Sequence, residues 1–229
     1  LPLIDAASAC GCEYYVIDAG WYAPGEWWDS VGEWKECRER FPDGIKEVTD
    51  YIRKKGMIPG VWLELEVMGI NCEKAKKAPD DWFFVRHGKR VYDRSRYQLD
   101  FRNPAVIEHV NEVIDRVVKE YGVGYIKMDY NIEPGIGTEI GTESVGQGLL
   151  EHEKAYLNWL DGVFARYPDL VIENCSSGGL RMDYALLSRY SIQSTSDQED
   201  YRNFATIAAN SPAGVTPEQA AIWSYPMRQ

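Results

Sequence analysis

The chain has 229 residues and a formal net charge of -11, and it is long enough to bury a large hydrophobic core. Its acidity argues against nucleic acid and anionic membranes as partners, because both bind basic protein faces. No apolar run approaches the roughly 18 residues of a membrane span, and no signal peptide is visible. The sequence begins at Leu1 rather than Met, so we expect a fragment of a longer protein.

The cysteines and the aromatic residues give weaker indications of the cellular compartment and of the ligand. The five cysteines are an odd number and show neither C-x-x-C nor Cys/His zinc spacing, so we expect free, buried thiols. Free thiols favour a cytoplasmic location, with secretion left open because the natural N-terminus is expected to be missing. The 8 tryptophans and 15 tyrosines suit a sugar pocket and equally a tryptophan-rich core.

Runs of apolar and β-branched residues predict a series of strands, each followed by glycine, proline or charged residues. In chain order the expected strands are 13–17, 57–63, 98–101, 125–131, 170–174, 191–195 and a seventh that begins within 219–225. Helical periodicity between them predicts helices over 3–12, 45–55, 104–120, 149–167 and 182–190. Residues 80–91 fit neither pattern and are interpreted as an excursion within a loop.

This alternation of strand, charged loop and helix predicts an α/β fold with a parallel sheet and right-handed crossovers. At this length a (β/α)8 barrel of the TIM type is favoured, incomplete because the chain supplies about six to seven strands. Residues 1–229 would then form one catalytic barrel domain. An open doubly wound sheet is the alternative, but no G-x-G-x-x-G turn follows the first strand.

Polar and charged side chains stand where the expected strands end. They are Asp18, Glu64, Asp100, Lys127, Asp129, Cys175 and Asp197. Active sites of (β/α)8 barrels lie at the C-terminal ends of the strands. Because burying unpaired charge is costly, these groups must face one another, water or a ligand.

Two carboxylates on separate strand ends are the groups that glycoside hydrolysis needs, and Asp129 and Asp197 are the best pair. Lys127 precedes Asp129 by two residues, so both side chains project to one face of a strand, and the lysine would keep Asp129 ionised as a nucleophile. Burial against aromatic residues would raise the pKa of Asp197 toward acid duty. Which of Asp197, Glu199 and Asp200 is the acid stays open at this point.

Each of these residues also has a structural interpretation. Lys127 and Asp129 on one strand face also suit an ion pair, and a Ser-Asp sequence before a helix is commonly an N-cap. Cys175 beside a glycine-rich loop suggests a nucleophile, but no histidine stands near a strand end to activate it. A metal site of Asp18, Glu64 and Asp129 would contain no histidine and would be opposed by the lysine, so we expect no metal.

The joint pattern carries more weight than any single motif. The segments DAGWY, GVWLELE, RSRYQLD, KMDYN, NCSSGG and TSD follow one another at the expected strand ends. In this order they resemble glycoside hydrolase family 36, the α-galactosidase (melibiase) family of clan D. The resemblance runs from about Leu3 to about Met227, and KxDxN and CSxGG followed by SD are its more specific parts.

The resemblance implies a role for each matched residue. Asp129 of KxDxN would be the nucleophile and Asp197 of SD the acid/base. The implied sugar-binding residues are Asp18, Trp62, Arg94, Lys127, Asn131, Cys175, Gly178 and, less directly, Gly179.

Two departures from the family pattern bear on specificity. The usual first motif is D-D-G-W, whose two aspartates bind sugar hydroxyls, and here the second position is Ala19. A lost hydrogen bond in a buried site costs on the order of 1 kcal/mol or more, so the preference for plain galactose should weaken. Leu65 replaces the proline often found in W-x-E-P-E, which is expected to change loop shape rather than chemistry.

The sequence thus predicts a retaining, exo-acting α-glycosidase, in the first place an α-galactosidase that hydrolyses terminal α-galactosyl residues of oligosaccharides. One alternative is a related α-glycosidase or transglycosylase acting on α-N-acetylgalactosaminides or β-L-arabinopyranosides. Another is a non-catalytic sugar-binding barrel. No cofactor is expected, and the resemblance leaves assembly into a homo-oligomer open.

Overall fold

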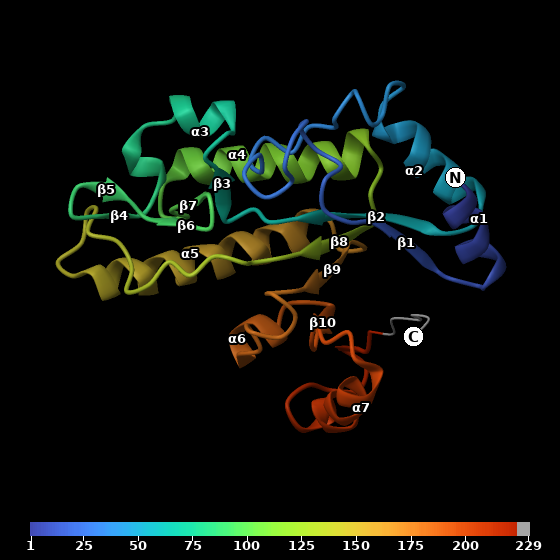
Figure 1. The fold of residues 1–229 in the computed structure, drawn as a ribbon. Coiled ribbons are helices and arrows are strands. Elements are labelled where there is room, and N and C mark those ends of the chain that lie inside the picture. Colours follow the sequence, from blue (N-terminus) through green and yellow to red (C-terminus); the bar gives the residue numbers. More distant parts are fainter. Residues whose placement is uncertain (224–229) are drawn as a thin grey trace.

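Six parallel strands form the principal sheet, in the order β1-β2-β8-β9-β10-β11 (Figure 1). The structure is a computed structural model that describes residues 1–223. The strands are β1 (Tyr14–Ile17), β2 (Ile58–Leu63), β8 (Tyr125–Met128), β9 (Val171–Asn174), β10 (Ile192–Ser194) and β11 (Ala220–Ala221). Every neighbouring pair is parallel, and the sheet is curled, as in part of a TIM-type barrel. The prediction of an incomplete (β/α)8 barrel is confirmed.

Helices connect these strands and flank the sheet, with α4 and α5 as the long ones in Figure 1. They are α1 (Pro2–Ala9), α2 (Ile45–Lys54), α4 (Pro104–Asp115), α5 (Val145–Arg166), α6 (Tyr184–Leu187) and α7 (Tyr201–Asn210). Local chemistry fixes where α4 starts: Asn103 accepts the N–H of Ala105, and Pro104 occupies the first turn. A π-helical turn (η2, Arg116–Glu120) prolongs α4, so the predicted helix over 104–120 is two segments.

A long excursion separates β2 from α4 and lies at the end of the molecule away from the N-terminus (Figure 1). It contains β3 (Val67–Gly69), α3 (Glu73–Lys77), a 3-10 turn (η1, Asp80–Trp82), β4 (Val85–Arg86), β5 (Lys89–Arg90), β6 (Tyr92–Asp93) and β7 (Arg96–Gln98). Its strands form small antiparallel sheets, β3-β7-β6 and β4-β5. Residues 80–91 were predicted to be such an excursion.

The predicted barrel strand over 98–101 is wrong. The actual strand, β7, ends at Gln98 and pairs antiparallel with β3, because a two-residue hairpin turns the chain back after β6. Asp100 therefore does not stand at the end of a barrel strand. The apolar pattern of the segment reflects packing of the excursion on the core, where Leu99 and Phe101 are buried.

Other differences lie near the C-terminal end. The expected helix over 182–190 is only the four-residue α6, and α7 was not predicted. The seventh expected strand is represented by β11, and the part of 219–225 after residue 223 lies outside the described residues. The strand expected over 125–131 ends at Met128, so Asp129 and Asn131 belong to the segment that follows it.

The core is rich in aromatic side chains, with Trp21, Trp34 and Trp62 almost fully buried. All five cysteines are free: three are buried as predicted, whereas Cys10 and Cys12 are exposed. Within residues 1–223, no helix combines the length and the apolar character needed to cross a membrane.

Candidate active site

Three neighbouring strands end at one edge of the principal sheet, and their register aligns the polar side chains there. Lys127 of β8 is paired with Trp62 of β2 and with Glu173 of β9. The ladder continues past β8: the N–H of Asp129 donates to the last carbonyl of β2 at 2.7 Å, and the N–H of Cys175 donates to the last carbonyl of β8 at 2.8 Å. Asp129 therefore occupies a fixed backbone position between two strand ends.

The Asp129 carboxylate is held by three N–H donors. The indole Nε1 of Trp62 donates to Oδ2 at 3.0 Å, and the backbone N–H groups of Tyr130 and Ser177 donate to Oδ1 at 2.8 and 3.2 Å. Only 9% of the residue is exposed, so few other orientations are open to it. Such fixed donors preorganise a carboxylate for reaction.

Trp62, whose indole donates to this carboxylate, is held in place by packing against other aromatic rings. It is 1% exposed, and its ring packs against those of Tyr22, Trp27 and Trp34 at centroid distances of 6.1, 5.7 and 5.8 Å. The tryptophan-rich segment after β1 thus serves as a core that positions the indole N–H. The sugar contact that the resemblance implies for Trp62 stays a prediction.

Lys127 reaches across the sheet to the end of β1. Its Nζ lies 3.0 Å from Asp18 Oδ2, and it lies over the ring of Trp223 at 4.5 Å from the centroid. Burial alone would lower the pKa of Lys127, but Asp18 and the other acidic groups around it outweigh burial and raise this pKa. The ion pair in this structure joins Lys127 to Asp18, so the alternative of a structural Lys127–Asp129 ion pair is not what the described residues show, and the predicted influence of the lysine charge on Asp129 stays a prediction.

The three acids left open by the sequence have different positions. Asp197 lies in irregular chain after β10, whereas Asp200 caps α7 by accepting the N–H of Arg202 at 2.9 Å. The N-cap in this segment is thus Asp200. Glu199 is exposed between them. The charge of Asp129 contributes to a raised pKa of the Asp197 carboxyl.

The environment of Asp197 raises the pKa of its carboxyl. Partial burial is the largest cause, and the negative charges of Asp129 and, more weakly, Asp18 add to it, while Lys127 opposes them. A carboxyl with a raised pKa keeps its proton to higher pH, which suits a general acid.

The loop after β9 brings Cys175 and Gly178 to the same place. Gly178 has a φ of +86°, and a Cβ built on it would lie 2.6 Å from the backbone N of Asp197. Only glycine therefore permits this close approach of the two loops. Cys175 is buried, and burial together with the charge of Asp129 raises the pKa of its thiol, so the residue is a poor nucleophile.

Arg94 lies at the tip of the hairpin between β6 and β7. Arg94 and Ser95 have φ values of 47° and 63°, as in a type I′ turn formed without glycine. The Arg94 side chain is half-exposed and contacts the Glu133 carboxylate at 3.4 Å and the Asn131 carbonyl at 3.5 Å. Residue 94 thus approaches the site from the excursion rather than from a barrel strand.

Three further residues contact Asn131: Glu64, which was expected at a strand end, and Arg96 and Ser177, for which no role was predicted. Burial raises the pKa of Glu64 to about 7, Arg96 opposes this shift, and the charge of Asp129 adds to it. The signal that could have pointed to Arg96 is that Glu64 follows β2 directly, because a buried carboxylate there requires a cation as partner.

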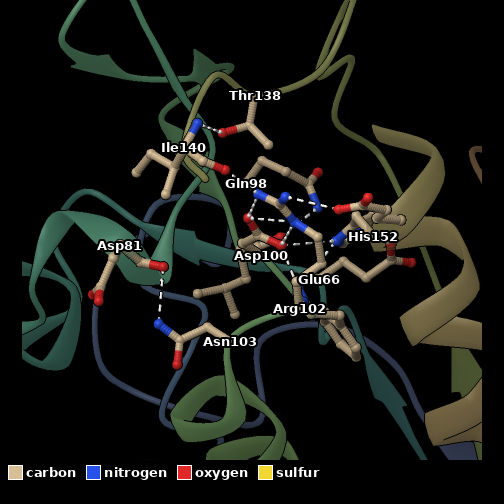
Figure 2. A network of polar contacts seen from close by, with 12 residues as sticks. Glu66, Asp81, Gln98, Asp100, Arg102, Asn103, Thr138, Ile140 and His152 are labelled. Atoms are coloured by element: carbon tan, nitrogen blue, oxygen red, sulfur yellow. Dashed lines mark hydrogen bonds and ion pairs between the residues drawn. The ribbon is translucent and has the colours of Figure 1, made fainter. Parts of the chain in front are cut away.

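A second polar network joins the excursion to α5 (Figure 2). Glu66 accepts hydrogen bonds from His152 Nε2 at 3.2 Å and from Arg181 Nη1 at 2.5 Å. Asp100, expected at a strand end, instead pairs with Arg102 at 2.6 Å in this network. These contacts tie the excursion to α5 and to the loop after β9. Within residues 1–223, no group of three or more His, Cys, Asp or Glu side chains could hold a metal ion.

Comparison with known proteins agrees with this architecture. The melibiase family model matches residues 1–219. The α-galactosidase Mel36A of Lactobacillus acidophilus is 28% identical over 184 residues, which are 79% of this chain and 25% of the relative. The α-galactosidase AgaA of Geobacillus stearothermophilus is 30% identical over 202 residues, which are 85% of this chain and 27% of the relative.

The crystal structure of AgaA, a family 36 enzyme, superposes with a TM-score of 0.87 at 25% sequence identity. The match covers 99% of this chain and 32% of that chain, so the chain spans about a quarter to a third of these relatives. Because the family model matches almost the whole chain, the resemblance to glycoside hydrolase family 36 is confirmed, and the chain belongs to the melibiase family.

Proposed function

We propose that this protein is a retaining, exo-acting α-galactosidase that removes terminal α-galactosyl residues from oligosaccharides. The observation that carries the proposal is the Asp129 carboxylate, which follows β8 directly and is fixed by three N–H donors. A second carboxyl, Asp197, follows β10, and the charge of Asp129 contributes to its raised pKa. The α-galactosidase relatives support it, as do AgaA variants crystallised with raffinose and stachyose.

In the proposed mechanism Asp129 attacks the anomeric carbon while Asp197 protonates the leaving oxygen. The resulting glycosyl-enzyme is hydrolysed when Asp197 removes a proton from water. Once Asp129 is glycosylated it carries no charge, and one cause of the raised pKa of Asp197 disappears. The same group is then ionised at lower pH and is available to accept a proton from water in the second step.

The proposal is tested with aryl α-galactosides and the full-length protein. We expect Asp129→Ala to lower kcat by roughly 10⁴-fold or more, because the nucleophile is lost. Asp197→Ala should hydrolyse an activated aryl galactoside far better than raffinose, since a good leaving group needs little protonation. The control is Asp169→Ala, an exposed carboxylate before β9, with unchanged activity. Full residual activity of Asp129→Ala contradicts the proposed nucleophile.

Retention is tested separately by following the first-formed product with proton NMR. A retaining enzyme releases the α-anomer first, and the carboxyl separation in a crystal structure should be about 5 to 5.5 Å. Initial release of the β-anomer would rule out the double displacement while leaving hydrolysis intact.

A second candidate rests on one residue. Ala19 removes a carboxylate from the first motif, next to Asp18 at the end of β1, and this favours an α-glycosidase or transglycosylase of altered sugar preference. Ala19→Asp should raise kcat/KM for α-galactosides roughly 5- to 10-fold if galactose is the natural sugar. Faster hydrolysis of an α-N-acetylgalactosaminide or a β-L-arabinopyranoside by the wild type would favour the second candidate. Galactose binding without turnover would indicate a non-catalytic barrel.

A further inference from the structure

The backbone of Asn131 is held at both of its polar groups by one buried ion pair. Its N–H donates to Glu64 Oε1 at 2.5 Å, and its carbonyl accepts from Arg96 Nη2 at 2.6 Å. Glu64 Oε2 and Arg96 Nη1 pair with each other at 2.5 Å, and neither side chain is exposed to any extent. The pair therefore closes a ring of contacts around the peptide groups of Asn131.

The side chain of Asn131 is held from another direction. Ser177 Oγ donates to Asn131 Oδ1 at 2.6 Å, while the N–H of Ser177 donates to the Asp129 carboxylate at 3.2 Å. Ser177 has a φ of 43°, in the left-handed region that disfavours serine. One strained residue thus links Asn131 to Asp129.

These contacts determine which group Asn131 offers to a ligand. Asn131, Ser177 and Arg94 line a cavity of about 430 Å³ beside the end of β8. The carboxamide oxygen is already engaged by Ser177, so the NH2 group of Asn131 is the donor that remains for this cavity. Its natural acceptor in a sugar is a hydroxyl oxygen.

We propose that Glu64, Arg96 and Ser177 are positioning residues that aim the carboxamide NH2 of Asn131 at a hydroxyl of the bound sugar. The inference rests on the proposed function and deepens it, because it assigns work to three residues outside the contacts implied by the family motifs. Precise placement matters since a misplacement of about 1 Å near reacting groups can reduce a rate roughly 100-fold.

The energetics of the ion pair favour positioning over stability. Removing two charges from water costs about as much as their attraction returns, so a fully buried pair is often no more stabilising than apolar side chains. Arg96 also has a buried Nε with no hydrogen-bond partner among the described residues, and its guanidinium lies over the Trp28 ring at 3.5 Å. The geometry that the pair imposes on Asn131 accounts for its presence.

A double-mutant cycle in the full-length protein tests whether Ser177 acts through Asn131. Asn131→Ala is expected to lower kcat/KM for an aryl α-galactoside roughly 10-fold, and Ser177→Ala roughly 5-fold, since each loses one hydrogen bond. The double variant should be no worse than Asn131→Ala. Losses that multiply would show that Ser177 acts independently and would overturn its assignment.

The ion pair is tested by replacing both partners, which leaves no unpaired buried charge. Glu64→Leu combined with Arg96→Met should keep the melting temperature near that of the wild type but lower kcat/KM roughly 10-fold. Amide hydrogen exchange should become roughly 10-fold faster in peptides that contain Asn131. Arg96→Lys, which keeps the charge but loses the fork, should share the kinetic loss, whereas Arg102→Lys should not.

The outcomes separate this inference from the proposed function. Unchanged exchange at Asn131, or unchanged kcat/KM, in the double replacement overturns the positioning role while wild-type hydrolysis continues. A wild type that hydrolyses no α-glycoside removes the proposed function. In that case the exchange measurement still decides whether the pair holds Asn131.

Discussion

The two carboxylates proposed for catalysis stand in opposite surroundings. Asp129 is 9% exposed and is fixed by Trp62 and by two backbone N–H groups. Asp197 is only partly buried and stays accessible to water, in irregular chain between the three-residue β10 and α7. A group that attacks from one direction gains from rigidity, whereas a group that donates and then accepts a proton needs contact with water. The difference therefore suits the two proposed roles.

Among changes that leave both carboxylates in place, the largest expected effect comes from disturbing the contact between Gly178 and the backbone of Asp197. Gly178→Ala would place a Cβ 2.6 Å from the backbone N of Asp197 at a φ of +86°, so one loop must move. We expect kcat to fall on the order of 100-fold, because Asp197 shifts relative to Asp129. Steady-state kinetics of the full-length variant measures this loss.

The matched control is Gly162→Ala near the C-terminal end of α5. No heavy atom lies within 4 Å of the added Cβ, and the residue is helical, so this variant should be stabilised by roughly 0.5 to 1 kcal/mol with unchanged kcat. An unchanged kcat for Gly178→Ala would contradict this prediction, because the position of Asp197 relative to Asp129 would not depend on the close approach of Gly178.

The next effect concerns Glu64, which accepts the backbone N–H of Asn131, and the pH dependence of its contribution to stability. Because the folded state raises the pKa of Glu64 from 4.5 to about 7, the folded protein binds a proton that the unfolded chain releases in this interval. The contribution of Glu64 to stability is therefore fully present below pH 4.5 and is lost as the pH rises through about 7.

Urea unfolding of the wild type and of Glu64→Gln measures this contribution. The difference in unfolding free energy, wild type minus variant, should decrease by roughly 1 to 3 kcal/mol between pH 4.5 and pH 7.5. A difference in unfolding free energy that is independent of pH would mean that the folded state does not raise the pKa of Glu64. The surroundings of Glu64 and Asn131 would then be more hydrated than their burial indicates.

A smaller effect is expected on the pKa of the Asp197 carboxyl. Since the charge of Asp129 contributes to the raised pKa of Asp197, Asp129→Asn should shift the pKa of Asp197 downward. Carbon-13 NMR titration of labelled aspartate in the full-length protein follows this carboxyl. An unchanged or higher pKa in the variant would indicate that burial alone sets it, and the two carboxylates would then be independent.

The smallest effect is expected at the periphery, in the hairpin that carries Arg94. Ser95 has a φ of 63°, so Ser95→Gly should stabilise the protein by roughly 0.5 to 1 kcal/mol while leaving kcat unchanged. Ser188→Gly at the end of α6, where φ is -70°, should not stabilise it. Thermal unfolding and steady-state kinetics measure these effects. A change in kcat for Ser95→Gly would show that the conformation of the hairpin turn affects catalysis.

The strands and long helices could be predicted because their signals are local. The apolar runs that became β1, β2 and β9 are short and bounded by turn or charged residues, and the periodicity of α5 extends over 22 residues. The segment 98–101 has the same local pattern, yet it belongs to an antiparallel excursion. Nothing within four residues distinguishes the two situations, because strand direction is decided by distant partners.

Helix α7 was missed for a different reason. Phe204 is its only buried residue in the described structure, so its apolar pattern is weak. Asp200 two residues before Arg202 is a typical N-cap, and this was the available signal.

The candidate site also has a part that could be predicted from local sequence and a part that could not. Positions such as Asp129 and Asp197 follow from the rule that barrel sites lie at strand ends. The contacts that support them join residues far apart in sequence: Asn131 lies 67 residues from Glu64, 35 from Arg96 and 46 from Ser177. No local pattern encodes such partners, and their identification requires coordinates.

The hairpin between β6 and β7 has a consequence for engineering. It belongs to the excursion between β2 and α4, so changing its turn leaves the pairing of β2 with β8 untouched. Its tip carries Arg94, a predicted sugar contact, while Arg96, two residues further, supports Asn131 from inside. A library that varies residues 92–95 but preserves Arg96 would therefore diversify substrate preference without dismantling the support of the catalytic strand.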